Sequence, residues 1–597
     1  MASPSRARYE AGMTIALGIT QSLTGQSWRW RGTGTLAGDP HALVADLLRA
    51  RGCPDHDVER QRRPTIRDFM PDPSLFRDMD AAAERIAHAV VAGERVTIFG
   101  DYDVDGATSA ALLIRLLRDL GLEVGYYIPD RLLEGYGPSA DALVRLGQAG
   151  SSLIVTVDCG AQAFEALEAA RACGIDVIVV DHHQCATALP PALALVNPNR
   201  LDECAEAAAH GHLAAVGVAF LLGAAVVRRL RGAGWFAKKA EPALLELLDI
   251  VALGTVADVA QIRGLNRAFV AQGLKVMARG GNIGLAALLR VSGLKRSPLC
   301  HDLGFALGPR INAGGRVGAA DLGVRLLTTT DPLEAEEIAA RLDQLNVERR
   351  AIEAAVQEEA ETQIARQENS AVVVAAGAGW HPGVIGIVAG RIKEKTGRPA
   401  IVIALDEDGN GKGKGSGRSI TGVDLGAAIL SARDEGLLVA GGGHAMAAGL
   451  TIAADRVDAF TAYLNDRLAA GVEIARRDRA LLIDTVVAPG GVTPALVETL
   501  DGAGPYGNGW PAPRIATGPA RIVKADVVGT GHVRAILSGE DGRSIKAVAF
   551  RQADQPLGQA LLGCGRDRRL WVTGRAKIDD WSGRTSAELH IDDAAWA

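Results

Sequence analysis

Acidic side chains follow a short apolar run near residue 100. The run 96–99 is typical of a buried strand, and three aspartates alternate directly after it: Asp101, Asp103 and Asp105. Ligands of open α/β sheets bind beyond the carboxyl ends of the strands. Because three neighbouring carboxylates repel one another, a bound cation is the simplest compensation. A helix-capping role for Asp105 stays open as an alternative, since aspartate is a common N-cap.

Two later apolar runs also end in residues that can bind a metal. The sequence LIVTVDCG places Asp158 after its run, and DVIVVDHHQC places three candidates after the next run: Asp181, His182 and His183. The carboxyl ends of neighbouring parallel strands lie at one edge of a sheet, so we expect these side chains beside the first acidic cluster. A carboxylate next to a metal-bound imidazole can fix the tautomer of the ring.

One more aspartate, Asp258, lies in the apolar segment LLDIVALGTVADV. The pattern predicts a helix that breaks at Gly254. Taken alone, a helix cap is the simplest interpretation of Asp258.

The elements expected to position these residues alternate between strands and helices. Apolar segments at 122–128, 153–157, 177–180 and 193–196 are separated by stretches rich in alanine, leucine and glutamate. This alternation predicts an α/β fold with a doubly wound parallel sheet. Residues 40–92, upstream of the first acids, have a mostly helical and amphipathic pattern.

The rest of the chain predicts three further parts. Residues 332–367 are highly charged and predict a connector helix of about 50 Å with a solvated face. Residues 370–470 contain the strand-like runs AVVVAA and PAIVIAL and two glycine-rich segments, GSGRS and GGGH, expected to be loops. Residues 475–597 show short alternating runs separated by turns, which is typical of an antiparallel barrel.

Composition limits the possible classes of protein. The 597 residues are 48% hydrophobic and 22% charged, which fits several globular domains. The net charge of -6 means that any nucleic-acid surface must be a local basic groove. Seven scattered cysteines without a CxxC pair argue against a disulfide framework and a zinc site, and favour the cytoplasm. We expect no membrane span and no signal peptide, and Met13 could be the true start.

Several motifs occur together in a characteristic order. GDYDVDG, VDCG, DHH and GTVADV are followed by GPRINAGGRVG, GSGRS, GGGHAMAAG and GPYGNGWPAP, and RLLEGYGPS lies among the first group. This series resembles the DHH phosphoesterase superfamily and, within it, the RecJ-type single-strand DNA exonucleases. The resemblance extends from about residue 80 to 515. It implies the following parts: an N-terminal leader and helical region (1–80), a DHH catalytic domain (81–330), a connector helix (331–368), a DHHA1 substrate-binding domain (369–472) and an OB-type domain that binds single strands (473–597).

The resemblance implies a site for two divalent metals, Mn²⁺ or Mg²⁺. Asp101 would bind one ion and Asp103 the other, Asp158 would bridge both, and His182 and Asp258 would complete the second site. Carboxylate ligands with one imidazole suit these ions better than soft metals. Two such ions can activate water and stabilise the attacking and leaving oxygens at phosphorus.

Two further positions, His183 and Phe99, bear on how this site would work. His183 would face the scissile phosphate and share the catalytic role with Asp158. Many relatives have a histidine ligand two residues before the first acid, where this chain has Phe99. We therefore expect the first metal to be held less firmly.

The resemblance also implies substrate-binding residues. Arg131, Ser416 and Arg418 would bind a 5'-terminal phosphate, because arginine and glycine-rich turns suit phosphate oxygens. The backbone near the cut would be held by Asn312 and Arg316.

Further substrate contacts are expected around this pocket. His444 would belong to the same cleft, between the first and second domains and too narrow for a duplex. Tyr136 would stack on a base or pack in the core. The OB-type domain offers five basic candidates for contact with single strands: Arg521, Lys524, Lys546, Arg551 and Arg575.

The sequence therefore predicts a metal-dependent exonuclease that degrades single-stranded DNA from the 5' end and releases 5'-mononucleotides in recombination and repair. We expect a cytoplasmic monomer that works with a helicase and a single-strand-binding protein. One alternative is a DHH phosphoesterase that acts on short oligonucleotides or cyclic dinucleotides. Another is a DNA-binding scaffold without catalysis, which the presence of all five metal-ligand candidates disfavours.

Overall fold

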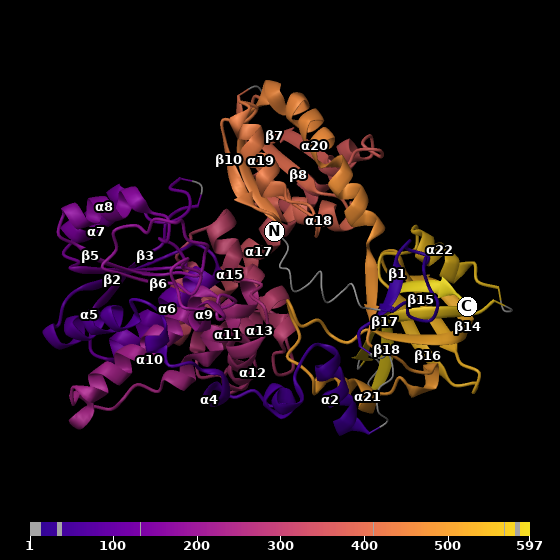
Figure 1. Ribbon diagram of the computed structural model, residues 1–597, viewed down its shortest axis with the longest axis horizontal. Coiled ribbons are helices and arrows are strands. Elements are labelled where there is room, and N and C mark those ends of the chain that lie inside the picture. Colours follow the sequence, from indigo (N-terminus) through magenta and orange to yellow (C-terminus); the bar gives the residue numbers. More distant parts are fainter. Residues whose placement is uncertain (1–13, 33–38, 132, 410, 566–567, 580–584) are drawn as a thin grey trace. The chain divides into compact units, whose positions relative to one another are not determined.

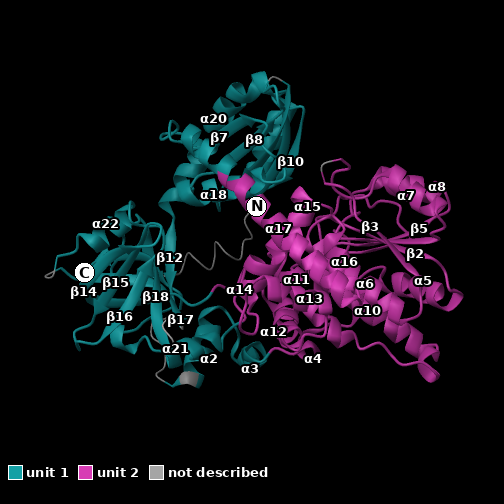
Figure 2. Ribbon diagram, turned by 180° about the vertical axis from the view of Figure 1, so that it is seen from behind, with its two compact units in different colours: residues 1–63, 355–504, 512–597 teal, residues 64–354, 505–511 magenta. Residues whose placement is uncertain are grey.

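The computed structural model describes residues 14–597 except 33–38, 132, 410, 566–567 and 580–584. The chain forms two compact units, which Figure 2 shows in different colours. Unit 2 comprises residues 64–354 and 505–511, and unit 1 comprises residues 1–63, 355–504 and 512–597. The expectation about Met13 lies outside the described residues.

A five-stranded parallel sheet forms the centre of unit 2, as predicted. Its strand order is β3-β2-β4-β5-β6. The strands are β2 (Val96–Gly100), β3 (Val124–Tyr127), β4 (Leu153–Val157), β5 (Asp176–Val180) and β6 (Ala194–Val196). Every residue of β2 and β4 is buried, because helices cover both faces of the sheet.

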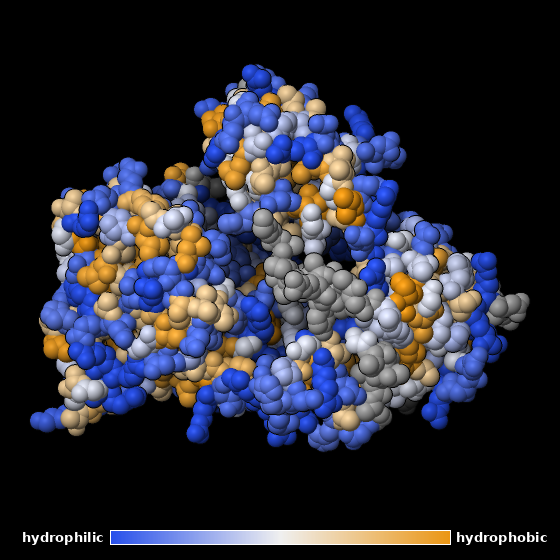
Figure 3. Space-filling model, viewed as in Figure 1, coloured by the Kyte–Doolittle hydropathy of each residue, from blue (hydrophilic) through white to orange (hydrophobic). Residues whose placement is uncertain are grey.

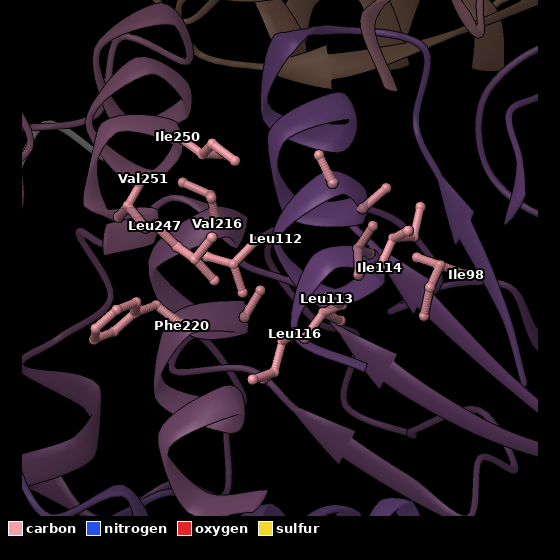
Figure 4. Close-up of a cluster of buried hydrophobic side chains, with 14 of the residues drawn as sticks. Ile98, Leu112, Leu113, Ile114, Leu116, Val216, Phe220, Leu247, Ile250 and Val251 are labelled. Atoms are coloured by element: carbon pink, nitrogen blue, oxygen red, sulfur yellow. The ribbon is translucent and has the colours of Figure 1, made fainter. Parts of the chain in front are cut away.

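The two faces of this sheet carry separate apolar clusters. Residues from α5 (Met79–Ala92), α6 (Val104–Asp119) and α10 (Ala215–Gly232) pack on one face, and residues from α7 (Ala140–Gln148) and α8 (Phe164–Ala172) pack on the other. Figure 4 shows the first cluster, where Ile98 of β2 lies near Leu113 and Ile114 of α6. The larger core continues into α11 (Leu248–Ala257), whose Ile250 and Val251 lie close to Val216 of α10.

Helix α11 runs through Gly254, so the predicted break at that residue is wrong. A side chain at Gly254 would place its Cβ 2.2 Å from Thr108 Oγ1 and 2.8 Å from Val216 Cγ1. The glycine therefore permits α11 to pack closely on α6 and α10, and the helix ends at Ala257 with Asp258 as its C-cap.

Short helices complete unit 2. They are α4 (Ile66–Phe69), α9 (Ala205–Ala208), α12 (Gly264–Ala278), α13 (Ile283–Val291), α14 (Cys300–Asp302), the π-helical segment η5 (Leu303–Leu307), α15 (Gly308–Val317) and α16 (Leu322–Thr328), with 3-10 turns η2 (Pro73–Leu75), η3 (Trp235–Ala237) and η4 (Leu244–Leu247). The predicted connector is confirmed as the 33-residue helix α17 (Pro332–Ile364), which begins in unit 2 and ends in unit 1.

Unit 1 contains a five-stranded mixed sheet of order β10-β11-β9-β8-β7. Its strands are β7 (Val373–Ala378), β8 (Ala400–Leu405), β9 (Lys412–Arg418), β10 (Ala440–His444) and β11 (Ala447–Ala453), and its helices are α18 (Ile385–Thr396), α19 (Leu425–Asp434) and α20 (Val457–Arg477). The glycine-rich segments GSGRS and GGGH lie largely in β9 and β10, so the expectation of loops there is wrong.

The glycines of β9 explain this difference. Gly413, Gly415 and Gly417 alternate with polar residues, which is the period of a strand. A Cβ at Gly415 would lie 2.6 Å from Leu450 Cδ1, and one at Gly417 would lie 2.7 Å from Leu425 Cδ2. The missing side chains thus make room for the apolar core beneath the sheet.

A closed barrel follows in the C-terminal part of unit 1, as predicted. It contains β13 (Thr485–Val486), β14 (Ile515–Val528), β15 (His532–Ser538), β16 (Ser544–Ala549), β17 (Leu570–Asp579) and β18 (Ser586–Trp596), with α21 (Pro494–Asp501) and α22 (Pro556–Leu562) beside it. Pairing of β14 with β17 closes the sheet. The last strand, β18, was not predicted, and it pairs with β16 in parallel.

The first described residues pack near this barrel. Strand β1 (Ser27–Trp30) pairs with β12 (Ala480–Ile483), and the indole of buried Trp28 donates a 2.9 Å hydrogen bond to Asp593 Oδ2. The helices α2 (Pro40–Ala50) and α3 (Val58–Arg62), with the 3-10 turn η1 (Asp55–Asp57), follow. The 3-10 turns η6 (Ala454–Arg456) and η7 (Pro489–Gly491) are the other short helical elements of unit 1.

Hydrophilic residues dominate the face of the molecule in Figure 3, with hydrophobic residues in small groups. Among the described residues, no helix combines the length and apolar character that crossing a membrane requires.

Candidate functional site

Three central strands of unit 2 end side by side, and each is followed directly by an aspartate. The residues are Asp101 after β2, Asp158 after β4 and Asp181 after β5. The backbone N–H of Asp101 donates to the carbonyl of Val157, and that of Asp158 donates to the carbonyl of Val180. The strand ladder therefore extends to these positions and brings the predicted residues together.

The loop after β2 carries the three alternating acids. Asp103 is the N-cap of α6, since its Oδ1 accepts hydrogen bonds from the N–H groups of Asp105 and Gly106 at 2.9 and 3.1 Å. Gly106 is required there, because a Cβ would lie 2.3 Å from the Asp101 carbonyl oxygen. The loop can pass this closely over the helix start only with glycine at that position.

Asp105 does not cap the helix that it begins. Its carboxylate is buried and accepts hydrogen bonds from the N–H groups of Ala215 and Val216 at 2.6 and 3.0 Å. Asp105 therefore binds the N-terminal turn of α10, 110 residues away in sequence. The local capping interpretation of Asp105 was wrong, because Asp103 already fills that role.

His182 lies at the centre of the acidic side chains. Its Nε2 is 3.2 Å from Asp158 Oδ1, 3.8 Å from Asp105 Oδ2 and 4.0 Å from Asp258 Oδ2. The side chains form three candidate metal groups: Asp101, Asp103 and Asp158; Asp158, His182 and His183; and Asp105, His182 and Asp258. Asp158 belongs to two of these groups, and so does His182.

Several atoms in this cluster lack a hydrogen-bond partner among the described residues. They are Asp101 Oδ1, Asp158 Oδ1 and His182 Nε2, and all three are buried. A buried polar atom without a partner costs about 1–3 kcal/mol. Oxygen and imidazole donors that converge in this way fit hard or borderline divalent cations such as Mn²⁺ and Mg²⁺.

The same burial changes the acidity of the cluster. Desolvation, followed by the charge of Asp103, raises the pKa of Asp101, and desolvation with the charge of Asp105 raises the pKa of Asp158 and of Asp258. Burial also raises the pKa of Asp105 to about 7. Without a cation, these carboxyl groups therefore hold protons that aspartate normally loses.

We expect the metal-free protein to lose stability as the pH rises above about 6.5. The folded state retains protons on Asp101, Asp158 and Asp258 that the unfolded chain has already released, so rising pH favours unfolding. The raised pKa of His183 acts in the same direction. The lowered pKa of His182, about 4, makes stability rise with pH, but only below about pH 6.5.

Thermal unfolding at pH 6.5 and pH 8 in a chelator, and again with excess Mn²⁺, measures this effect. Each unit of pKa shift on one carboxyl corresponds to about 1.4 kcal/mol. The Tm of the metal-free protein should fall with pH, and the gain from Mn²⁺ should be larger at pH 8 because the ion replaces protons. A metal-free Tm that rises over this interval contradicts the account.

The two adjacent histidines are held in different ways. Nδ1 of His183 lies 2.7 Å from Asp181 Oδ1, which also accepts from the backbone N–H groups of both histidines. The imidazole of His182 has a hydrogen bond with the backbone of Leu213 instead. Nε2 of His182 therefore points to the aspartates. In His183 it is Nδ1 that binds Asp181, so its Nε2 can bind a group from outside the cluster.

Asp181 also controls the charge of His183. Burial favours the neutral ring, but the hydrogen bond and charge of Asp181 outweigh it and raise the pKa of His183. Burial opposes ionisation of Asp181 too, yet the contacts with His183 lower its pKa to about 2. The pair is thus suited to keep a proton on His183 near neutral pH.

Tyr136 and Arg131 lie beside this cluster. The Tyr136 hydroxyl donates to the carbonyl oxygen of Asp158 at 3.0 Å and lies 3.1 Å from His183 Nδ1. Its ring meets the His183 ring edge to face, and Tyr136 is 54% exposed, so it does not pack in the core. Stacking of Tyr136 on a base stays a prediction. Arg131 lies over the ring of Tyr102, within the acidic loop.

Asn312 and Arg316 lie one turn apart on α15, which packs on the acidic loop. A Cβ at Gly315 would lie 2.5 Å from the carbonyl oxygen of Tyr102. The charge of Arg316 acts on the Tyr102 hydroxyl, which places the arginine close to this loop. These two residues are therefore brought near the metal-ligand candidates.

Ser416, Arg418 and His444 lie together in unit 1. Nη1 of Arg418 donates to Ser416 Oγ at 3.0 Å. Both Arg418 and His444 are level with Ala447 of β11, which lies between their strands. A Cβ at Gly386 would lie 3.0 Å from Ser416 Oγ, so the first turn of α18 also borders this group.

Phe99 is fully buried and stacks on Tyr127 with ring centroids 5.4 Å apart. It packs in the apolar cluster of α7 and α8 and offers no ligand atom. The looser binding of the first metal stays a prediction.

Sequence reasoning missed residues that support the site from a distance. Nδ2 of Asn508 donates to the carbonyl oxygen of Val259, which follows Asp258 and has a φ of 60°. Asn199 bridges the carbonyl oxygens of His182 and Gly211. Only the glycine-rich segment around Asn508 gave a signal, because glycine marks close backbone approach.

The basic candidates of the barrel differ in their surroundings. Lys546 is paired with Asp579 and Glu588 at 2.7 and 2.9 Å, so its charge is offset. Arg521, Lys524 and Arg551 are exposed. Arg575 lies 3.9 Å from Asp592.

Comparisons with known proteins identify the same family in all three parts of the chain. Residues 95–255 match the DHH family, N-terminal domain, residues 369–470 match the DHHA1 domain, and residues 483–593 match the RecJ OB domain. The chain is 38% identical to the single-stranded-DNA-specific exonuclease RecJ of Dickeya dadantii, covering 92% of this chain and 95% of that protein. It is 36% identical to the enzyme of that name from Escherichia coli, covering 94% and 97%.

A solved structure shows the same likeness in three dimensions. The crystal structure of RecJ from Thermus thermophilus in complex with Mn²⁺ has a TM-score of 0.76 and 29% identity to this chain. The match covers 92% of this chain and 75% of that one. A second structure of that protein contains Mg²⁺ and has a TM-score of 0.71.

Proposed function

The chain belongs to the RecJ family of single-stranded-DNA-specific exonucleases, and we propose that it hydrolyses single-stranded DNA from the 5' end and releases 5'-mononucleotides. The observation that carries this proposal is the convergence of aspartates and one histidine where the strand ends of unit 2 meet the C-terminus of α11. Their three unpartnered buried atoms favour bound divalent cations over a purely structural acidic cluster.

Two Mn²⁺ or Mg²⁺ ions would be held by five residues: Asp101, Asp103, Asp158, His182 and Asp258. Asp158 would contact both ions, since it belongs to two of the candidate groups. When bound, such ions supply an activated water and stabilise charge on the oxygens around phosphorus.

The protein's own side chains supply orientation and a proton site. Asp181 fixes the ring of His183 through Nδ1, so Nε2 is available to donate a hydrogen bond to a phosphate oxygen. The hydroxyl of Tyr136 binds the Asp158 carbonyl and restrains that loop. Asn312 and Arg316 hold the DNA backbone near the reacting phosphate.

A second set of residues would bind the 5'-terminal phosphate. Ser416 and Arg418 lie beside the first turn of α18, where helical N–H groups attract anions. His444 lies in the same group of unit 1. Arg131 of unit 2 would offer a planar guanidinium to a phosphate as well. Polarity from the 5' end follows from this recognition of a terminal phosphate.

The barrel of unit 1 favours a polymer over a short substrate, because exposed Arg521, Lys524 and Arg551 can follow a strand. We further propose that the enzyme acts in the cytoplasm as a monomer in recombination and repair. A helicase and a single-strand-binding protein would supply its substrate. Comparing a long strand with a dinucleotide tests the alternative of a small-substrate phosphoesterase.

Digestion of one strand labelled at either end with Mn²⁺ tests the reaction and its direction. We expect immediate release of the 5' label as a mononucleotide and late release of the 3' label. The matched duplex should be resistant, and a chelator should stop the reaction. Early loss of the 3' label, or internal cuts, would refute the proposed polarity.

A further inference from the structure

Residues 300–317 form one continuous helical run made of α14, η5 and α15. Phe305, in its π-helical part, is 70% exposed, and its ring stacks on His301 with centroids 4.3 Å apart and planes inclined by 24°. Single π-helical turns inside α-helices occur frequently at functional sites. An exposed aromatic ring that is already held by a second ring offers a rigid flat surface.

One side of this run is packed closely on the metal-ligand elements. A Cβ at Gly304 would lie 3.4 Å from Val256 Cγ1, and one at Gly308 would lie 3.2 Å from Ala257 Cβ. The next residue after Ala257 is Asp258. Gly315 also packs against the carbonyl of Tyr102 in the acidic loop, so the run lies beside both Asp258 and this loop.

The neighbouring side of the run carries the substrate-binding candidates. Phe305 directly follows Gly304, and Arg316 directly follows Gly315. Asn312 comes one turn after Gly308, so spacings of seven and four residues place these three side chains on roughly one face of the run. At 1.5 Å per residue, Phe305 is about 16 Å from Arg316 along the axis. This is the length of a few nucleotides of a single strand.

We propose that Phe305, supported by His301, is a stacking platform for a base of the single strand a few nucleotides from the reacting phosphate. The proposal rests on the proposed function. A base fits this surface because every base has a π-face, and the phosphates on either side of it continue onto Asn312 and Arg316. The platform binds all four bases, because stacking needs no base-specific hydrogen bond.

Replacing Phe305 by alanine tests the platform. Binding of a 5'-phosphorylated strand to Phe305→Ala should weaken about ten-fold, in line with the loss of one stacked base. Fluorescence anisotropy measures this in an Asp158→Asn background, in which the strand is not consumed. Phe305→Trp should restore binding. Val91→Ala is the matched control, because Val91 is 60% exposed on α5, just before the opposite end of β2.

An abasic nucleotide moved along the strand separates stacking from a structural effect. The parent protein should bind about ten-fold more weakly when the abasic nucleotide occupies one particular position, and Phe305→Ala should be insensitive at that position. Equal sensitivity of both proteins at every position, or unchanged binding by Phe305→Ala, would overturn the platform. If the unmodified chain neither binds nor degrades single strands, the proposed function itself fails.

Discussion

Replacing Asp158 by asparagine is expected to lower kcat by on the order of a thousand-fold or more, with single-strand binding changed only a few-fold. Asp158 is 2% exposed, its Oδ1 has no hydrogen-bond partner among the described residues, and it belongs to two candidate metal groups. Loss of this negative charge should therefore weaken both proposed metal sites together, while the proposed phosphate-binding residues of unit 1 are unchanged.

Asparagine is chosen as the replacement because of the backbone conformation at residue 158. Asp158 has a φ of 61°, a conformation that asparagine tolerates better than alanine, so Asp158→Asn separates the loss of charge from backbone strain. Digestion rates, strand binding and bound Mn²⁺ should be measured on identically purified proteins. Asp176→Asn is the control, because Asp176 begins β5 at the opposite edge of the sheet and pairs with Arg85.

Two outcomes would contradict the role of Asp158. Near-normal turnover, in preparations without contaminating nucleases, would show that the metals do not depend on this carboxylate. Loss of strand binding together with turnover would place Asp158 in substrate binding instead.

The second large effect concerns the adjacent histidines: replacing His183 should lower turnover, whereas replacing His182 should weaken metal binding. His183→Ala should lower kcat by about 10²- to 10⁴-fold with little change in Mn²⁺ affinity. His182→Ala should instead weaken Mn²⁺ binding, because Nε2 of His182 lies among three carboxylates. The distinction arises because Asp181 occupies Nδ1 of His183 and directs the ring away from a simple ligand role.

Calorimetric Mn²⁺ titration and rates at saturating Mn²⁺ separate the two effects. Excess Mn²⁺ should partly rescue His182→Ala and leave His183→Ala unchanged. His88→Ala is the control, since His88 is exposed and pairs with Glu94 before β2. Equal weakening of Mn²⁺ binding in both variants would instead favour the candidate group in which both histidines and Asp158 bind one ion.

Local pattern was sufficient for most of the elements. Continuous apolar runs predicted β2 to β6, because strands covered on both faces need no polar alternation. The charged segment without internal glycine or proline predicted α17. The same reasoning failed at Gly254 and in β9, where glycine provides space for a neighbouring side chain instead of a turn.

The candidate metal ligands were also predictable, because each lies within three residues of a strand or helix end. Asp101, Asp158 and His182 could be placed together once the sheet was known to be parallel, since parallel strands end at one edge. Strand β18 was missed, and its parallel pairing with β16 depends on closure of the barrel.

The sequence by itself determined the parallel sheet, the order of the motifs and the residue types that can bind two cations. These features are encoded in runs of a few residues, where periodicity and strand ends suffice. Only the tertiary structure decided that Asp105 binds the start of α10, that Asp181 holds His183 through Nδ1, and that Asn508 supports the loop after Asp258. Such contacts join residues that are far apart in the chain, or depend on a rotamer, and packing alone selects them.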